Sequence, residues 1–173
     1  MVFRNPQRRK KGFDYARNGY YYITICTRYR YLWFGKIRDG NVVLSDCGAI
    51  VKNQWEWLAT QYQYIRLDEY VVMPDHFHGI VQIDNDTMRK RAVDVGRDRV
   101  DAVRERHLQT HTQLHHKTIG RIIGAFKTTS SKMIHIAGHP FFSWQRSFHD
   151  RIIRNDMELF RIRSYIRNNP SKG

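Results

Sequence analysis

The sequence predicts an α+β fold in which helices cover a mostly antiparallel β-sheet. Residues 20–27 are rich in aromatic and β-branched side chains, which is typical of a buried strand. Two further apolar runs, 66–73 and 76–83, are separated by Pro74-Asp75, which indicates an antiparallel pair or one strand with a bend. Apolar residues recur at helical spacing in three other segments, 50–61, 119–136 and 156–168.

Turn and cap signals bound the elements of the first half. Asp39-Gly40 lies between two short apolar runs within 32–44 and predicts a hairpin turn. Ser45 or Asp46 can cap the helix that follows. The apolar face of that helix, which continues to about Gln61, consists of Ile50, Val51, Trp55 and Leu58.

Glycine, proline and asparagine bound the two helices of the second half. Gly138 and Pro140 end the helix predicted over 119–136. The segment 141–153 is aromatic, and we expect it to be extended. Asn155 or Asp156 caps a last helix that continues to about Asn168, before Pro170.

The composition indicates a folded domain with an anionic partner. The chain has 173 residues, of which 41% are hydrophobic, so one domain over 1–173 can bury a core. Its formal net charge is +14, which argues against an ordinary enzyme of small metabolites, and its 13% aromatic content excludes a disordered basic tail. A polyanion such as nucleic acid is the expected partner. A basic surface kept for solubility or for anionic lipid is the alternative.

Two segments differ from the rest of the chain. Residues 1–19 are predicted to form a basic arm, and residues 84–116, rich in Arg, Asp, Val and His without sustained periodicity, a flexible insertion. The insertion and its edge hold four histidines, His107, His111, His115 and His116. A metal cluster there is conceivable, but a polar segment without periodicity favours solvated side chains.

Other functions and locations find no support in the sequence. Cys26 and Cys47 form neither a CxxC motif nor a disulfide framework, which indicates reduced thiols. No apolar stretch has the length of a membrane span or the form of a signal peptide. Glycine-rich nucleotide-binding motifs are also absent. We therefore expect a cytoplasmic protein that shares its compartment with the nucleoid and has no membrane partner.

The segment 71–81 contains two histidines in a His-x-His pattern, His76 and His78. Residues two apart in a strand point to the same face, so the two imidazoles can lie side by side while Phe77 faces the core. Two neutral imidazoles are good ligands for a divalent metal. Histidine pairs without a metal are also common on protein surfaces, and the pattern alone leaves both interpretations open.

The last helix carries a second candidate group, Tyr165 and Asn169. Tyr165 lies next to the buried stripe of this helix, and Asn169, four residues later, would lie one turn further along the same face. A tyrosine phenol can attack a metal-polarised phosphodiester, and an asparagine oxygen can serve as a third metal ligand. In the alternative interpretation, Tyr165 is a half-buried packing residue and Asn169 ends the helix.

Several motifs occur together in a specific combination. Residues 73–79 form a Met-Pro-x-His-x-His-Gly block, 144–146 read Trp-Gln-Arg, and 165–170 form Tyr-Ile-x-Asn-Asn-Pro. Further matching segments are 12–15, 22–27, 119–127 and 152–155. In this order the segments resemble the single-tyrosine HUH transposases, and most closely the REP-associated tyrosine transposases. The resemblance covers nearly the whole chain except residues 84–116.

The resemblance implies a ferredoxin-like antiparallel sheet with helices packed on it, the HUH endonuclease fold. It assigns His76 and His78 as metal ligands, Tyr165 as the nucleophile and Asn169 as the residue that completes the metal site. The implied cofactor is a divalent metal, Mg²⁺ or Mn²⁺. The implied substrate is single-stranded DNA next to a hairpin, a palindromic REP element, which is cut and rejoined through a 5′-phosphotyrosine. Relatives include dimers and monomers, so a homodimer stays open.

Contacts to DNA are expected from basic and aromatic side chains outside this site. The basic candidates are Arg8, Arg9, Lys10, Lys11, Arg121, Lys127, Arg146 and Arg154. The candidates for stacking on unpaired bases are Tyr15, Tyr29, Tyr31 and Trp33, of which some must belong to the core.

Three other functions compete with that of a transposase. A non-catalytic nucleic-acid-binding domain of ferredoxin-like fold accounts for the charge but does not require Tyr165 or the histidine pair. A metal-dependent phosphodiesterase would use water, and Tyr165 would then serve packing. A domesticated or decayed transposase would bind DNA without cutting it.

Overall fold

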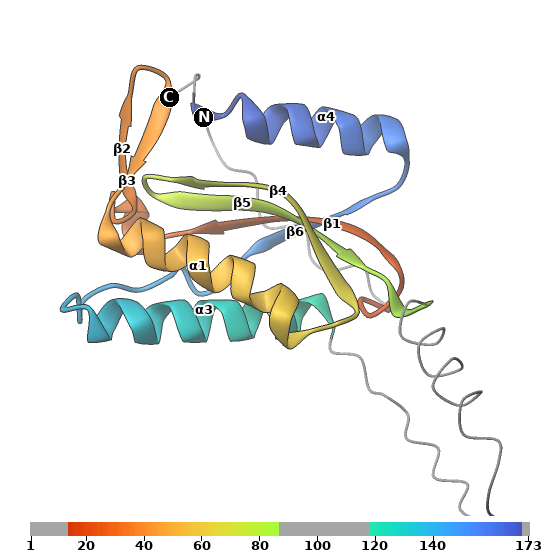
Figure 1. Ribbon diagram of the computed structural model, residues 1–173, viewed down its shortest axis with the longest axis horizontal. Coiled ribbons are helices and arrows are strands. Elements are labelled where there is room, and N and C mark those ends of the chain that lie inside the picture. The colour runs from red at the N-terminus through yellow and green to blue at the C-terminus, as the bar shows by residue number, and fades with distance from the viewer. Residues whose placement is uncertain (1–13, 87–117, 171–173) are drawn as a thin grey trace, which may run out of the picture.

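The computed structural model describes residues 14–86 and 118–170, and its centre is a four-stranded antiparallel sheet (Figure 1). Its strands are β1 (Gly19–Cys26), β4 (Ile65–Met73), β5 (His76–Ile83) and β6 (His149–Ile153). They lie in the order β4-β5-β1-β6, so β5 separates β1 from β4 and is antiparallel to both. This split βαβ arrangement is ferredoxin-like, as expected.

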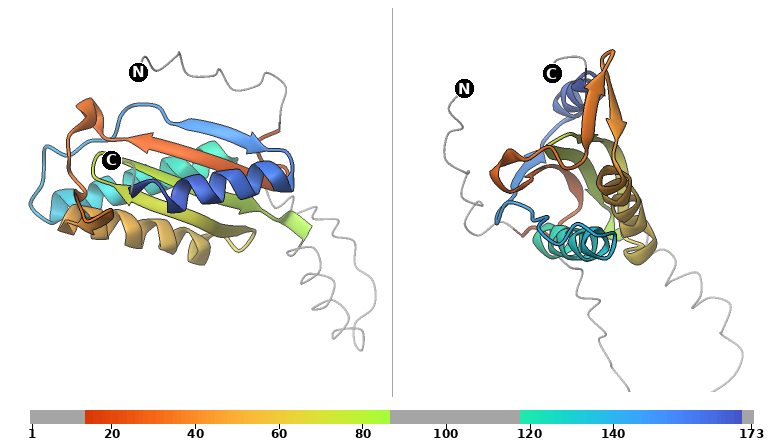
Figure 2. Two further views of the ribbon diagram at one scale, coloured as in Figure 1. Left: turned by 90° about the horizontal axis from the view of Figure 1, so that it is seen from above. Right: turned by 90° about the vertical axis from the view of Figure 1, so that its left-hand side faces the viewer.

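Among the described residues, three α-helices cover the two faces of this sheet. α1 (Asp46–Gln61) and α3 (Ile119–Ile136) lie on one face, and α4 (Asp156–Arg167) lies alone on the other (Figures 1 and 2). Ser45 caps α1 by accepting a hydrogen bond from the Gly48 amide, and Asn155 caps α4 in the same way from the Glu158 amide. Of the two cap candidates predicted for each helix, the first is the one observed.

A short helix and a hairpin connect β1 to α1. The 3-10 helix η1 (Arg28–Arg30) follows β1, and the hairpin consists of β2 (Gly35–Arg38) and β3 (Asn41–Leu44). Asp39 and Gly40 have φ angles of 49° and 71°, which places both turn residues in the left-handed region. The predicted turn is therefore confirmed, and it forms a separate two-stranded sheet.

The main core lies between the sheet and the helix pair α1 and α3. Phe77 on β5 is fully buried there, with its ring centroid 4.5 Å from that of Trp55 and 5.4 Å from that of Phe126. A Cβ atom on Gly79 would lie 2.6 Å from Trp55 Cζ2, so only glycine allows the Trp55 ring this close to the strand. Because neighbouring side chains on β5 point to opposite faces, His76, His78 and Ile80 face α4 instead.

Within the segment 141–153, which was expected to be extended, only β6 forms a strand, and loop residues precede it. Phe142 and Trp144 are buried in the core, and Trp144 Nε1 donates a hydrogen bond to Ser130 Oγ on α3. An isolated bridge joins Trp144 to Thr27. Phe142 and Trp144 are thus buried residues of a loop. A high aromatic content is found in buried loops as well as in strands, so composition alone could not distinguish them.

The described ends of the arm and of the insertion meet at one edge of the domain. Asn85 donates a hydrogen bond from its side-chain Nδ2 to the Ala16 carbonyl oxygen. The backbone amide of Asn85 donates to Asn18 Oδ1. Residues 1–13 and 87–117, with most of the arm, most of the insertion and its four histidines, lie outside the described residues. Within the described residues, no helix is both long and apolar enough to cross a membrane.

Candidate active site on the face of the sheet under α4

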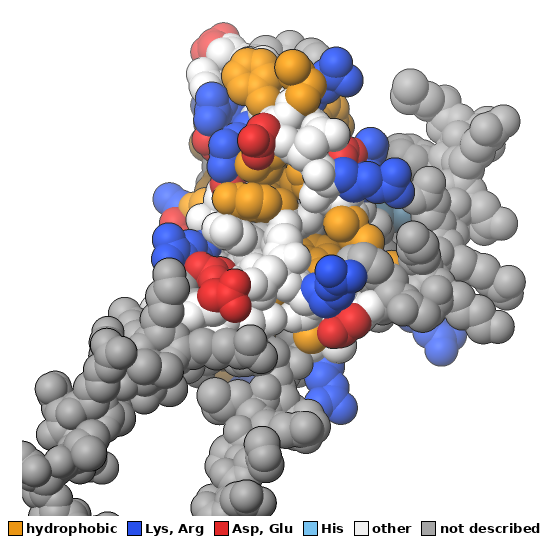
Figure 3. Space-filling view, turned by 90° about the vertical axis from the view of Figure 1, so that its right-hand side faces the viewer, with side chains coloured by type: hydrophobic (Ala, Val, Ile, Leu, Met, Phe, Trp, Pro, Cys, Tyr) orange, Lys and Arg blue, Asp and Glu red, His pale blue; other side chains and the backbone are white. Residues whose placement is uncertain are grey.

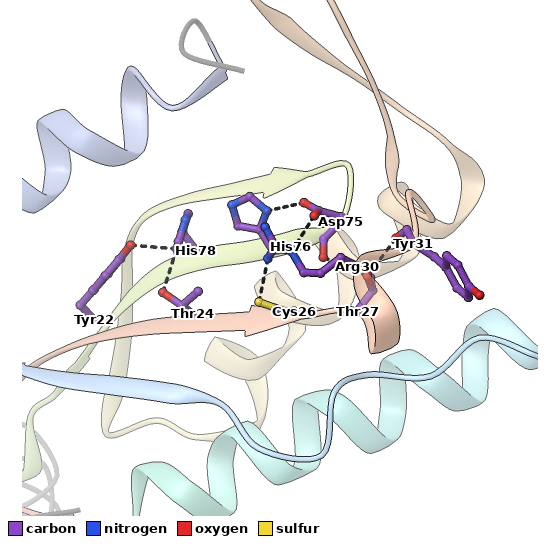
Figure 4. A network of polar contacts seen from close by, with 9 residues as sticks. All are labelled: Tyr22, Thr24, Cys26, Thr27, Arg30, Tyr31, Asp75, His76 and His78. Carbon is purple, nitrogen blue, oxygen red and sulfur yellow. Dashed lines mark hydrogen bonds and ion pairs between the residues drawn. The ribbon is translucent and has the colours of Figure 1, made fainter. Parts of the chain in front are cut away.

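The histidine pair lies on the face of β5 that α4 covers. The ring centroids of His76 and His78 are 4.7 Å apart, so the strand brings the two imidazoles side by side as the spacing predicts. In the register of the sheet, His78 lies opposite Thr24 and His76 opposite Cys26 on β1. Side chains from β1 therefore approach the pair from below (Figure 4).

His78 is buried, with 5% of its surface exposed, and its Nδ1 atom is held by two hydroxyl groups. Nδ1 lies 2.8 Å from Tyr22 Oη and 2.9 Å from Thr24 Oγ1 (Figure 4). Burial, together with the nearby His76 and Arg30, lowers the pKa of His78 from 6.5 to about 3. The ring is thus neutral near pH 7, and when Nδ1 donates to one hydroxyl, Nε2 has a free lone pair.

His76 is oriented by a carboxylate. Its Nδ1 donates a hydrogen bond of 2.5 Å to Asp75 Oδ1, and Arg30 Nε lies 2.8 Å from Asp75 Oδ2. Burial lowers the pKa of His76, although the hydrogen bond to Asp75 acts in the opposite direction. A carboxylate on Nδ1 fixes the tautomer with the lone pair on Nε2, which is the arrangement of many metal-binding histidines.

Tyr165 on α4 faces the histidine pair. Its ring meets that of His78 edge to face, with the centroids 5.5 Å apart. The side chain is 44% exposed. The phenol ring is therefore next to the His78 imidazole and also accessible from solvent.

Two ion pairs hold α4 on the sheet on either side of Tyr165. Arg163 donates from Nε and Nη2 to the two oxygens of Asp68, and Arg167 donates from the same two nitrogens to Glu69 Oε1. Asp68 and Glu69 are consecutive on β4, where the register shifts between Leu67 and Tyr70. This irregularity lets two neighbouring side chains reach the same face, which a regular strand does not allow.

α4 ends at Arg167, two residues before Asn169. Asn169 is therefore not on the helix, and the expected position one helical turn after Tyr165 is not observed. Its amide donates to the Ile166 carbonyl oxygen at 3.3 Å, and its side chain is buried. Among the described residues, Asn169 Nδ2 has no hydrogen-bond partner. In Figure 1 the end of α4 and the start of β5 lie at the same end of the molecule.

The donor set suits a divalent metal. It consists of two imidazoles that are neutral near pH 7 and the buried amide of Asn169, whose Nδ2 has no partner in the described structure. The amide of Asn169 can rotate to present its oxygen in place of nitrogen. Among the described residues no cluster of three or more His, Cys, Asp or Glu side chains is arranged to hold a metal. Two nitrogens and one oxygen favour Mn²⁺ over Mg²⁺, which prefers oxygen ligands.

The predicted DNA contacts are distributed unevenly. Arg121, Arg146 and Arg154 are exposed, whereas the Lys127 ammonium donates to the carbonyl oxygens of Gln145, at 2.7 Å, and Arg146. The residues Arg8, Arg9, Lys10 and Lys11 lie outside the described residues. On the end of the molecule seen in Figure 3, basic side chains lie among acidic and hydrophobic ones.

The stacking candidates divide into two groups. Tyr29 and Tyr31 are 71% and 61% exposed and can meet a ligand. Tyr15 and Trp33 pack against the core. Composition could not separate these groups, because all four lie in short irregular segments where no periodicity marks the buried side.

Sequence reasoning missed the residues that surround the histidine pair. Asp75 is adjacent to His76 in the chain, so its role could have been noticed. Tyr22 and Thr24 alternate along a recognised strand, but only the pairing of β1 with β5 brings them to His78. The Asp68 and Glu69 contacts depend on an irregularity of β4 for which the sequence has no clear signal.

Comparisons with known proteins bear on the fold and on the family of this chain. The structure is similar to that of a REP-associated tyrosine transposase bound to a REP hairpin, with a TM-score of 0.55 and 15% identity. The match covers 96% of this chain and 73% of that one, and it confirms the fold that the sequence resemblance implied. The chain is also 32% identical over 162 residues to an uncharacterised protein of Haemophilus influenzae, across 94% of this chain and 86% of the relative. It belongs to the same family as that protein. A comparison with protein-family models finds no match.

Proposed function

We propose that the protein is a metal-dependent tyrosine transposase of the HUH type, which cleaves and rejoins single-stranded DNA beside a hairpin. The observation that carries this proposal is the contact between Tyr165 and His78 on a face that also holds His76. A domain that only binds DNA has no need for a half-exposed phenol beside two neutral imidazoles. The REP hairpin bound by the structural neighbour supports hairpin DNA as the substrate. Such a protein acts in the cytoplasm, at the nucleoid.

The chain's own residues supply the nucleophile and its orientation. Tyr165 Oη attacks the phosphorus, the bond from phosphorus to the 3′-oxygen breaks, and the phenol proton ends on that oxygen. The products are a 5′-phosphotyrosine and a free 3′-hydroxyl, so no external co-reactant is consumed. The reverse attack by a 3′-hydroxyl rejoins DNA and releases Tyr165.

His76, His78 and Asn169 would hold the divalent ion. When bound, such an ion polarises the phosphodiester and stabilises the leaving oxygen, which stabilises the transition state by several kcal/mol. Asp75, Tyr22 and Thr24 keep the two imidazoles in orientation through their Nδ1 atoms. Arg163 and Arg167 keep α4, and with it the phenol, against this face.

The test is the formation of a covalent adduct. The protein is incubated with Mn²⁺ and labelled single-stranded hairpin oligonucleotides from the sequence that flanks its gene, and the products are separated under denaturing conditions. We expect a protein–DNA band that chelator prevents. The double variant His76→Ala with His78→Ala should bind the oligonucleotide but form no adduct. Cleaved DNA without an adduct would instead identify a hydrolase that uses water, and intact DNA a binding protein.

A further inference from the structure

A surface pocket of about 680 Å³ lies between η1 and the loop that follows α3. One wall contains Arg28, Tyr29 and Arg30, and the other contains Trp144, Gln145 and Arg146. Backbone hydrogen bonds join the walls, from the Arg28 amide to the Ser143 carbonyl oxygen and from the Gln145 amide to the Cys26 carbonyl oxygen. Because Lys127 also binds the carbonyl oxygens of residues 145 and 146, the second wall is braced against α3.

The exposed groups of the pocket combine an aromatic face with cations. The Tyr29 side chain is 71% exposed, and the Arg28 guanidinium carbon lies 4.8 Å from its ring centroid. Arg146 is exposed on the opposite wall. An aromatic ring flanked by guanidinium groups is the combination that binds a nucleobase together with a neighbouring phosphate.

The backbone that presents Tyr29 is strained. Tyr29 and Arg30 have φ angles of 58° and 60°, so two consecutive residues other than glycine adopt the left-handed conformation. Such residues cluster at ligand sites, where the surrounding structure maintains them. Here Arg30 is held by its ion pair with Asp75 and by a contact from Nη1 to Cys26 Sγ at 2.9 Å (Figure 4).

A chain of polar contacts connects the pocket to the histidine pair. Arg30 lines the pocket and binds Asp75, and Asp75 in turn accepts the hydrogen bond from His76. A DNA strand whose phosphodiester lies at the histidines would therefore place an adjoining nucleotide at this pocket.

We propose that this pocket binds one unpaired nucleotide of the DNA strand next to the scissile phosphodiester. The base stacks on Tyr29, and Arg28 and Arg146 contact the flanking phosphates. This inference rests on the proposed function for the identity of the strand. It extends that function by assigning a binding site separate from the metal ligands and the nucleophile.

The test measures binding in the Tyr165→Phe background with a chelator present, so that cleavage plays no part. The probe is a fluorescein-labelled oligothymidylate of about 10 nucleotides, followed by fluorescence anisotropy. We expect Tyr29→Ala to weaken binding about tenfold, as the loss of one stacked base does, while Tyr29→Phe restores it. The matched control is Phe141→Ala, which removes an exposed aromatic side chain that does not line the pocket.

Two results would overturn the pocket assignment. One is unchanged binding of the single strand by Tyr29→Ala. The other is an equal loss for a duplex of the same length, which would indicate a contact to DNA without need of an unpaired base. Thermal unfolding of Tyr29→Ala and Tyr29→Phe checks that both fold. Because binding is measured without cleavage, failure of adduct formation by the wild-type protein would count against the proposed function alone.

Discussion

The rings of Tyr165 and His78 meet edge to face, with 5.5 Å between their centroids, although they belong to the last helix and to a central strand. His78 is buried and neutral near pH 7, whereas Tyr165 is 44% exposed. The contact therefore joins a buried, neutral imidazole to a phenol that solvent can reach. Every contact that holds α4 on the sheet therefore contributes to this relationship.

The ion pair between Arg163 and Asp68 positions the tyrosine helix. Asp68→Asn removes the charge and weakens the two hydrogen bonds from Arg163. We expect the free energy of unfolding to fall by about 1–2 kcal/mol, because a partly buried charged pair loses one member. The rate of adduct formation should fall while DNA affinity is retained.

Arg66→Gln is the matched control for this helix contact. Arg66 is an exposed residue of β4, and its Nη2 lies 3.8 Å from Asp84 Oδ2. Loss of this ion pair should change the free energy of unfolding by less than about 0.5 kcal/mol. Equal effects of both variants in urea denaturation would show that the Asp68 contact has no special role.

Asn169 should contribute to metal affinity without being needed for folding. Asn169→Leu removes the amide, and we expect Mn²⁺ affinity to fall about tenfold, whereas Asn169→Asp provides a carboxylate oxygen and should keep or strengthen binding. Isothermal titration of Mn²⁺ measures both, with Asn168→Ala as the neighbouring control. Unchanged affinity in Asn169→Leu would remove this residue from the metal site.

Acid should destabilise the metal-free protein through His78. The unfolded chain protonates this residue near pH 6.5, but in the folded protein its pKa is lowered to about 3. The stability contributed by the neutral ring is thus complete above about pH 6.5. It is lost progressively as the pH falls from 6.5 to about 3. At about pH 5 we expect the free energy of unfolding to be about 2 kcal/mol below its value near pH 7.

Urea denaturation with a chelator present measures this pH dependence. His78→Gln should show a shallower decrease, whereas His149→Gln, at an exposed position, should follow the wild type. Equal slopes for the wild type and His78→Gln would contradict the burial of a neutral imidazole.

Gly79 leaves room for the rings of Trp55 and Phe77, which pack on the face of β5 opposite the histidine pair. In Gly79→Ala the new Cβ would lie 2.6 Å from Trp55 Cζ2 and 2.8 Å from Phe77 Cε1, and both rings are fully buried. We expect a loss of about 1–3 kcal/mol in the free energy of unfolding, because the rings have no space to move.

Gly124→Ala provides the opposite case on helix α3. Apart from the adjacent residues and the nearby backbone of α3 itself, no atom lies within 4 Å of the added Cβ. The protein should gain about 0.5–1 kcal/mol in the free energy of unfolding, because alanine lowers the backbone entropy of the unfolded chain. A stable Gly79→Ala variant would contradict the packing described for this strand.

Much of the fold could be predicted because local signals were strong. Ser45 and Asn155 are caps in both the sequence and the structure, and Asp39-Gly40 is the hairpin turn. The segment 141–148 could not be predicted, because buried aromatic residues occur in loops as well as in strands. The side of the sheet that each helix covers depends on tertiary packing, which no local pattern contains.

The candidate site was only partly visible in the sequence. Period-two alternation was enough to bring His76 and His78 to one face. The contact of Tyr165 with His78 requires α4 to lie on that face, which long-range contacts such as Arg163 with Asp68 determine. Lys127 was expected at a phosphate, but its ammonium binds two backbone carbonyl oxygens, a contact that depends on the loop around 145–146.

The most direct test of the account is whether Tyr165 forms the bond to DNA. The wild-type protein and Tyr165→Phe are each incubated with Mn²⁺ and a labelled single-stranded hairpin oligonucleotide, and the adduct is digested with protease and mapped by mass spectrometry. Tyr31→Phe, which alters another exposed tyrosine, is the control. We predict an adduct on Tyr165 in the wild type and in Tyr31→Phe, and none in Tyr165→Phe. An adduct that persists in Tyr165→Phe would contradict the assignment of the nucleophile.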